Sequence, residues 1–274
     1  MKEEEAYSIL DIISESDGQS VILTRSGSIC IPFELRQPEC YSLSPEEIDE
    51  RDGMYREAFR HMPDGTYVHK QDVFLKKEYH PGKGTGSFLD RADARHFEGR
   101  LYIDHTCILH FVLAGLKSLE KAYVSSPLAY KEHLHREDYR KLEAFLEGVD
   151  NAVSILQNMR GNSVLPMSCE GISGFTRAYS GLFGDTDAVV DIHVDGSLHV
   201  GKNHARCYAV CDETFLPEGN IESYVRDESL PPAASQLYHP LMEQLGMYLP
   251  YNHIVNQVIY FEGNERLRSR IARN

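Results

Sequence analysis

The sequence predicts an α+β fold built mostly from antiparallel sheets with packed helices. Two hairpin signals favour antiparallel strands: β-rich runs flank Ser26-Gly27 within residues 20–35, and others flank Asp195-Gly196 within residues 188–201. A long helical period over residues 136–159 supplies an apolar stripe that needs a partner surface. Strands that pair locally and helices that pack on them form this class of fold.

The first third of the chain predicts a hairpin over residues 20–35 and a helix over 44–62. Pro32 indicates that the second strand of the hairpin is an edge strand or carries a bulge, because proline cannot donate to a ladder. The helix begins with Ser44 as its N-cap and Pro45 at its first position, where proline is favoured. Its expected apolar face consists of Ile48, Tyr55, Phe59 and Met62. Gly53 weakens this helix by about 1 kcal/mol, so a break there is compatible with the sequence.

The middle of the chain predicts two strands and two helices. Residues 66–79 alternate in burial as a strand does, and residues 101–116 are apolar enough for a central strand. Between them, a capping box formed by Ser87 and Asp90 starts a helix. The helix over 136–159 repeats its apolar residues at three and four positions: Tyr139, Leu142, Leu146, Val149, Val153 and Leu156.

The last part of the chain is predicted to be less regular. Glycines in 161–187 suggest a mobile connection. After the 188–201 hairpin we expect a strand over 205–217, a short helix from 235 and a last strand over 253–261. We expect one domain over 1–262, divisible into subdomains 1–160 and 185–262, with 263–274 beginning a linker helix.

Composition excludes several classes of protein. The chain has 274 residues and a mass of 31.2 kDa, and its apolar fraction of 42% is typical of globular proteins. Its net charge of −14 repels phosphate backbones, so direct nucleic-acid binding is not expected. No secretory signal opens the sequence and no apolar run approaches the ~20 residues of a membrane span, which favours a cytoplasmic protein. The six cysteines are scattered without a C-x-x-C pair, so we expect reduced and mostly buried thiols.

A glycine-rich stretch, HPGKGTGSFLD at 80–90, suggests a phosphate-binding loop but does not match one. A Walker A loop needs glycine five residues before Gly82 and Ser or Thr after Lys83, and the sequence has Lys77 and Gly84 there. The dinucleotide pattern fails as well, because Ser87 stands where a third glycine is needed. A flexible loop before a helix is the favoured reading, with a weak anion site at Lys83 and Ser87 as the alternative.

A metal site is the second chemical alternative. Asp191 and His193 share one face of the 188–201 hairpin, and a three-residue loop would place His199 opposite His193, completing a 2-His-1-carboxylate set. A two-residue turn, which Asp-Gly favours, would put His199 on the other face and leave a solvated strand. A hydrolase nucleophile is not indicated, because "GISGF" has Phe175 where the G-x-S-x-G elbow needs glycine, and a loop is expected there.

Several segments together resemble a known family: "SGSICIPFEL", "VHKQDVF", "SFLDRADARHFEGRLYIDH", "LHVGKNHARCYAVCDETFLP" and "LGMYLPYNHIVNQVIYFE". They are similar to the N-terminal region of Bacteroides-type TraG proteins, the conjugation ATPases of conjugative transposons, related to the motor ATPases of type IV secretion. The most specific run contains Tyr248, Leu249, Pro250, Asn252, His253, Asn256 and Gln257.

The resemblance implies a non-catalytic domain that takes part in DNA transfer through protein–protein interaction. Its expected partners are conjugation-channel proteins and other subunits of the same ATPase, which would hold it at the periphery of the inner membrane. The family's Walker motifs lie in a C-terminal domain, so no cofactor is expected in this segment, and ATP and magnesium are expected only downstream. No catalytic residue is carried over, and a structural role is favoured for Asn252, His253 and Asn256.

Overall fold

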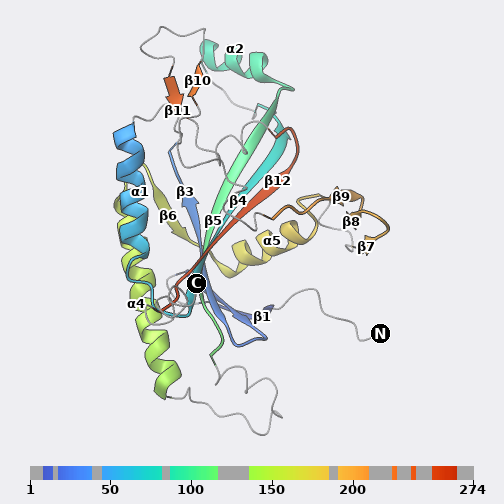
Figure 1. Ribbon diagram of the computed structural model, residues 1–274. Helices are drawn as coiled ribbons and strands as arrows, with labels where there is room; N and C mark the ends of the chain where they lie inside the picture. Colours follow the sequence, from blue (N-terminus) through green and yellow to red (C-terminus); the bar gives the residue numbers. More distant parts are fainter. Residues whose placement is uncertain are drawn as a thin grey trace.

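A computed structural model of the chain describes residues 9–14, 18–38, 45–81, 87–116, 136–184, 191–209, 224–226, 236–238 and 249–263. The described part consists of helices packed on antiparallel sheets, so the α+β class is confirmed (Figure 1). Lys83 of the alternative anion site and residues 264–274 of the expected linker helix lie outside the described residues.

One seven-stranded antiparallel sheet organises the fold, with strand order β1-β2-β3-β5-β4-β12 and β6 paired beside β3. Its strands are β1 (Ile9–Ser14), β2 (Ser20–Thr24), β3 (Ile29–Arg36), β4 (Thr66–Glu78), β5 (Leu101–Leu113), β6 (Ser163–Pro166) and β12 (His253–Tyr260). The predicted strands at 20–35, 66–79, 101–116 and 253–261 therefore all belong to this sheet.

β3 lies inside the sheet, so the prediction of an edge strand at Pro32 is wrong. β5 pairs with residues 29–35 along one side of β3, and Pro32 faces His110 there. On the other side β2 pairs only with Ile29 and Cys30, whereas β6 pairs with residues 33–36. Pro32 occupies the junction between these two neighbours, where no ladder partner requires its missing N–H.

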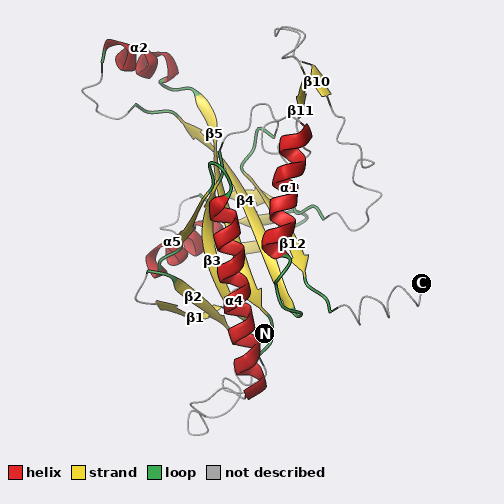
Figure 2. Cartoon of the chain, turned by 90° about the vertical axis from the view of Figure 1, so that its left-hand side faces the viewer, coloured by secondary structure: helices red, strands yellow, loops and turns green. Residues whose placement is uncertain are grey.

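Two helices, α1 (Pro45–Phe59) and α4 (Arg136–Asn158), cover one face of the sheet (Figure 2). The main core lies between them and the strands; its largest fully buried members include Phe111, Phe145, Leu109, Leu116 and Leu156. α1 continues through Gly53 without a break.

The predicted stripe of α4 is partly wrong. Tyr139 and Leu146 are exposed, whereas Phe145 and Ala152 are buried. The buried line is therefore rotated by about one residue from the predicted one. Gly148 explains part of the difference: an added Cβ would lie 3.3 Å from the His61 carbonyl oxygen, so α4 approaches the end of α1 at this position.

A third helix, α5 (Cys169–Ser180), lies beside β1 and β2 on the other face and corrects the expectation of a connection over 161–187. The segment "GISGF" is thus helical. Ser168 caps this helix by accepting a hydrogen bond from the Gly171 N–H at 3.2 Å. Ile172 is buried against Ile22, Cys30 and Val112. This burial outweighs the low helix propensity of the glycines, which had suggested a loop.

The smaller elements are α2 (Phe88–Phe97), the three-stranded sheet β7 (Ile192–Val194), β8 (Leu198–Val200) and β9 (Asn203–Ala205), and the pair β10 (Tyr224–Arg226) and β11 (Gln236–Tyr238). β11 lies where a helix was expected, so that prediction is wrong for 236–238. The strand expected over 205–217 is not seen in 206–209, and its remainder lies outside the described residues. The division into two subdomains stays a prediction, with β12 belonging to the sheet formed by the first part of the chain.

Candidate functional site

The β4–β5 hairpin extends beyond the rest of the sheet as an arm. The two strands, of 13 residues each, pair with one another along their whole length. β3 pairs with β5 only from Cys107 onward, and β12 pairs with β4 only as far as Phe74. Among the strands that the structure describes, none pairs with residues 75–78 or 101–104 from outside the hairpin. We define the arm as these residues together with α2 and residues 98–100 after it, which project from the sheet in Figure 2.

The tip of the arm presents large apolar side chains to solvent. None of the α2 residues is buried, and Phe88, Leu89 and Leu101 are 76%, 70% and 62% exposed. Local contacts fix the helix: the Phe97 ring meets Tyr79 edge-on at 6.3 Å, and the Arg100 guanidinium lies 5.5 Å from the centre of the Phe97 ring. These contacts fix the position of α2 relative to the strands, and the apolar side chains at the tip remain exposed to solvent.

The N-terminus of α2 carries the predicted capping box. Ser87 Oγ accepts a hydrogen bond from the Asp90 N–H at 3.3 Å, and Asp90 Oδ2 accepts one from the Ser87 N–H at 2.6 Å. The Asp90 carboxylate thus occupies the position that a bound anion would take at this helix end. Of the two residues of the alternative anion site, only Ser87 is described, and its contacts do not support anion binding.

The three residues of the resembling motif hold β12 to β4. Asn252 Oδ1 accepts a hydrogen bond from the Lys76 N–H at 2.8 Å, at the base of the arm. The His253 ring stacks on Phe74 with centroids 4.6 Å apart, and its Nδ1 lies 2.8 Å from the Tyr251 carbonyl oxygen. Each of these contacts joins the motif to the adjacent strand or to its own turn, and the structural role of the motif stays a prediction.

Asn256 ends a chain of hydrogen bonds that crosses four strands. His110 lies 2.9 Å from Gln71 Oε1 through Nε2 and 3.7 Å from Cys30 Sγ through Nδ1. Gln71 Nε2 donates in turn to Asn256 Oδ1 at 3.0 Å, and His69 Nε2 lies 2.9 Å from the same oxygen. A neutral His110 with its proton on Nε2 satisfies both of its contacts, with the Cys30 thiol as donor to Nδ1.

Burial keeps His110 and Cys30 uncharged. It lowers the pKa of His110 to about 4, with a smaller contribution from the neighbouring His69. It also raises the pKa of the Cys30 thiol to about 12. Cys107 behaves in the same way, with a pKa raised to about 12 by burial. These two thiols are therefore poor nucleophiles. Of the four cysteines in the described part, all reduced, Cys169 is half-buried and Cys207 is exposed.

Asp72 is a buried carboxylate on the opposite face of β4. Its Oδ1 lies 2.9 Å from His105 Nε2, and its Oδ2 pairs with the Lys70 ammonium. Burial alone would raise the pKa of Asp72, but the hydrogen bond from His105 and the charge of Lys70 together lower it. His105 also stacks on Phe74 at 4.5 Å, so the ion pair is continuous with the contacts of β12.

The 188–201 hairpin has a three-residue loop, contrary to the shorter turn that Asp-Gly favours. Val194 pairs with Leu198 and His193 pairs with His199, leaving Asp195, Gly196 and Ser197 in the loop. His193 and His199 are therefore on one face, as the metal-site alternative required. Asp191 Oδ2 lies 3.7 Å from His193 Nδ1.

Sequence reasoning missed two further residues at this hairpin. Asp195 Oδ1 lies 2.8 Å from His199 Nε2, closer than any contact of Asp191 to a histidine nitrogen that the structure shows. His204 stands on β9 opposite His199, with ring centroids 4.2 Å apart. The sequence indicates Asp195 only as part of the Asp-Gly turn. His204 could be identified only from the pairing of β9 with β8, which places it opposite His199.

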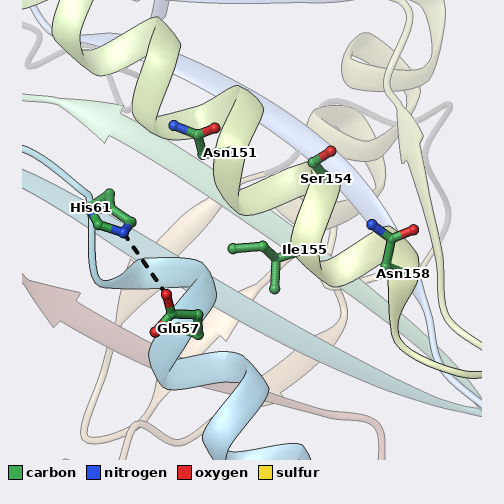
Figure 3. Close-up of a pocket in the computed structure, with 6 residues that line it drawn as sticks. All are labelled: Glu57, His61, Asn151, Ser154, Ile155 and Asn158. Carbon is green, nitrogen blue, oxygen red and sulfur yellow. Dashed lines mark ion pairs between the residues drawn. The ribbon is translucent and has the colours of Figure 1, made fainter.

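A groove of about 450 Å³ lies between α1 and α4, lined by Glu57, His61, Asn151, Ser154, Ile155 and Asn158 (Figure 3). His61 Nε2 and Glu57 Oε1 face each other across 3.9 Å. The lining is polar and contains a single carboxylate, so it offers no acid–base pair of carboxyl groups.

No protein-family model matches the chain, and a search of curated proteins finds no match. Among the helices that the structure describes, none combines the length and the apolar character needed to cross a lipid bilayer.

Proposed function

We propose that this chain is a non-catalytic docking and assembly module of a conjugation ATPase of the Bacteroides TraG type. In this proposal the arm binds a conjugation-channel protein or a neighbouring ATPase subunit. ATP and magnesium act in a separate C-terminal domain, and the module is peripheral at the inner membrane through its partners. The similarity of several sequence segments to the N-terminal region of TraG proteins supports the family. The exposed apolar tip of the arm supports a docking role.

The apolar tip of the arm is the observation that carries the proposal. A large apolar side chain moved from water into an interface contributes about 1.5–3 kcal/mol, so Phe88, Leu89 and Leu101 offer a strong anchor. Neighbouring exposed apolar side chains, such as Phe88 and Leu89 at the start of α2, are a mark of interaction sites. Asp90, Arg91, Asp93 and Arg95 on α2 supply charges of both signs around them, as in the polar rim of an interface.

Net charge favours a protein partner over the transferred DNA. With 42 acidic and 28 basic side chains, the chain has a field that opposes a phosphate backbone. The arm uses aromatic and aliphatic groups, whose burial depends little on salt. We therefore assign the DNA contact to other parts of the transfer apparatus.

The test uses the full ATPase in conjugating donor cells. The double substitution Phe88→Ser with Leu89→Ser removes the apolar anchor from exposed positions, so the fold should persist while transfer frequency falls at least about tenfold. Tyr139→Ser with Leu146→Ser, on exposed positions of α4, is the matched control and should leave transfer unchanged.

A photo-crosslinking amino acid at position 89 should in addition capture a channel protein or another ATPase subunit. Normal transfer by the Phe88/Leu89 variant at normal protein level would refute the arm as docking surface. Hydrolysis of ATP by the purified chain would refute the assignment of ATPase activity to a separate domain.

A stand-alone metal enzyme using Asp191, His193 and His199 is the second candidate. The shared face of His193 and His199 favours it. The side chains of Asp191 and His193 are 84% and 50% exposed, however, so a substrate there would remain in bulk water. This exposure favours metal binding over catalysis at the hairpin.

A further inference from the structure

We propose that the β7–β8–β9 sheet binds a zinc-like divalent transition metal ion through His193, Asp195 and His199. This site differs from the set expected from the sequence, because Asp195 replaces Asp191. It is independent of the docking function, and it lies on the small sheet beyond the end of α5 in Figure 1.

Strand register brings three imidazoles into one row. His193 pairs with His199 across β7 and β8, and His199 pairs with His204 across β8 and β9. Side chains directly opposite one another in antiparallel strands project from the same face. The rings of His193 and His199 are parallel within 1° with centroids 4.7 Å apart, and His204 follows at 4.2 Å from His199.

The loop returns a carboxylate to this row. Gly196 has a φ of +100°, which a residue with a side chain rarely adopts, and it allows the loop to turn within three residues. Asp195 then reaches His199, with Oδ1 2.8 Å from Nε2. One donor atom from each of His193, Asp195 and His199 lies within 4.8 Å of the others.

These distances suit a small metal ion after minor side-chain rotation. Four-coordinate zinc with bonds of about 2.0–2.1 Å holds its donors about 3.3 Å apart. The donor atoms of His193, Asp195 and His199 are separated by distances on either side of that value. Asp195 Oδ1 and His199 Nε2 are 2.8 Å apart, and no two of the three donor atoms are more than 4.8 Å apart. His204 is the next imidazole in the row, but it is not among the donors that lie within 4.8 Å of one another, so the proposed ligands are His193, Asp195 and His199.

The donor set selects the class of ion. Two imidazole nitrogens and one carboxylate oxygen favour zinc, cobalt, nickel and copper(II), whereas magnesium and calcium require oxygen ligands. The side chain of His199 is only 17% exposed and that of His193 is 50% exposed, so an ion can reach the site without unfolding of the hairpin. Ser197 Oγ lies 2.9 Å from the same His199 Nε2, so an ion bound at this nitrogen displaces that contact.

A bound ion would stabilise the β7–β8–β9 sheet, which has few other stabilising contacts. Its strands have three residues each, and Ile192 and Val194 are exposed. Short strands with little apolar burial contribute little stability by themselves. An ion that binds the folded hairpin adds its binding free energy to the folded state.

The test is zinc titration of the tag-free, metal-stripped chain by calorimetry, with cobalt(II) absorption as a second readout of the ligands. We expect one equivalent to bind. His193→Gln, His199→Gln and Asp195→Asn should each weaken binding at least about 100-fold, beyond the 10- to 100-fold typical of outer-shell groups. Asp191→Asn should weaken it less than about tenfold. His61→Gln, at an exposed histidine between α1 and β4, is the matched control and should bind as the parent does.

Circular dichroism of each variant separates loss of ligands from loss of fold. No saturable binding at zinc concentrations up to about 100 μM would overturn the proposal. Binding that persists in His199→Gln would also overturn it. An effect of Asp191→Asn as large as that of Asp195→Asn would refute this set of ligands.

Discussion

Asn256 shows how much a single residue depends on the rest of the fold. Its side-chain oxygen accepts a hydrogen bond from Gln71, which lies 185 residues earlier in the chain. The sequence singles out Asn256 through the motif it matches, and its amide predicts a hydrogen-bonded role. The partners could not be predicted, because they depend on the register of β12 against β4.

His110 should make stability fall in weak acid. In the unfolded chain its imidazole has a pKa near the ordinary value of 6.5, whereas in the folded protein burial lowers that pKa to about 4. Between these values the unfolded chain binds a proton that the folded protein does not. The free energy of unfolding therefore decreases as the pH falls from 6.5 to 4, by about 2 kcal/mol between pH 7 and pH 5.

Urea unfolding at pH 7 and pH 5 measures this effect. His110→Gln keeps a donor for Gln71 but cannot titrate, so the variant should lose less stability than the parent between the two pH values. His61→Gln removes an exposed histidine and should behave as the parent. An equal loss in the parent and in His110→Gln would contradict the buried neutral imidazole.

The elements differ in how well their sequences predict them. α4 agrees with its predicted limits to within one residue because its helical period is long and uninterrupted. α5 was missed because Gly171 and Gly174 weaken its local signal, and its stability depends on burial of Ile172. In the hairpin, the Asp-Gly pair favours a two-residue turn, whereas the pairing of His193 with His199 leaves a three-residue loop.

Two glycines test the packing around these helices. Gly161 follows α4 with a φ of +81°, and an added Cβ would lie 2.9 Å from Pro38 Cγ, so Gly161→Ala should destabilise the protein by about 1–3 kcal/mol. Gly174 lies within α5 with open space around it, and Gly174→Ala should stabilise the protein by about 1 kcal/mol. Urea midpoints measure both changes, and a gain in stability from Gly161→Ala would contradict the close approach to Pro38.

At the scale of the whole molecule, the seven-stranded sheet brings together distant parts of the chain. The sequence predicts the class of fold and most of its strands, since their apolar patterns are local. It does not predict that the last strand completes the edge beside β4, because that pairing joins residues nearly two hundred positions apart. The arm was likewise not foreseen, because its exposure depends on where β3 and β12 stop pairing.

Removal of β12 tests this arrangement. A chain that ends at residue 250 leaves residues 67–74 of β4 with a free edge and without Asn256. Their amide protons should exchange faster in hydrogen–deuterium exchange, because an edge strand opens more readily than an enclosed one. Peptides covering β1 and β2, at the opposite edge, should change little. Unchanged protection of residues 67–74 would contradict the pairing of β12 with β4.

The arm also has the shape of a lever. Its paired residues 75–78 and 101–104 extend from a base where Asn252 meets Lys76. Four residues of strand span about 13 Å, so a tilt of about 10° at the base would displace the outer end of these strands by about 2 Å. A partner attached to the tip could therefore sit slightly out of alignment with the sheet and still remain bound. A small difference in angle between the partner and this protein would then be taken up by bending of the two arm strands, without any change in the hydrophobic core.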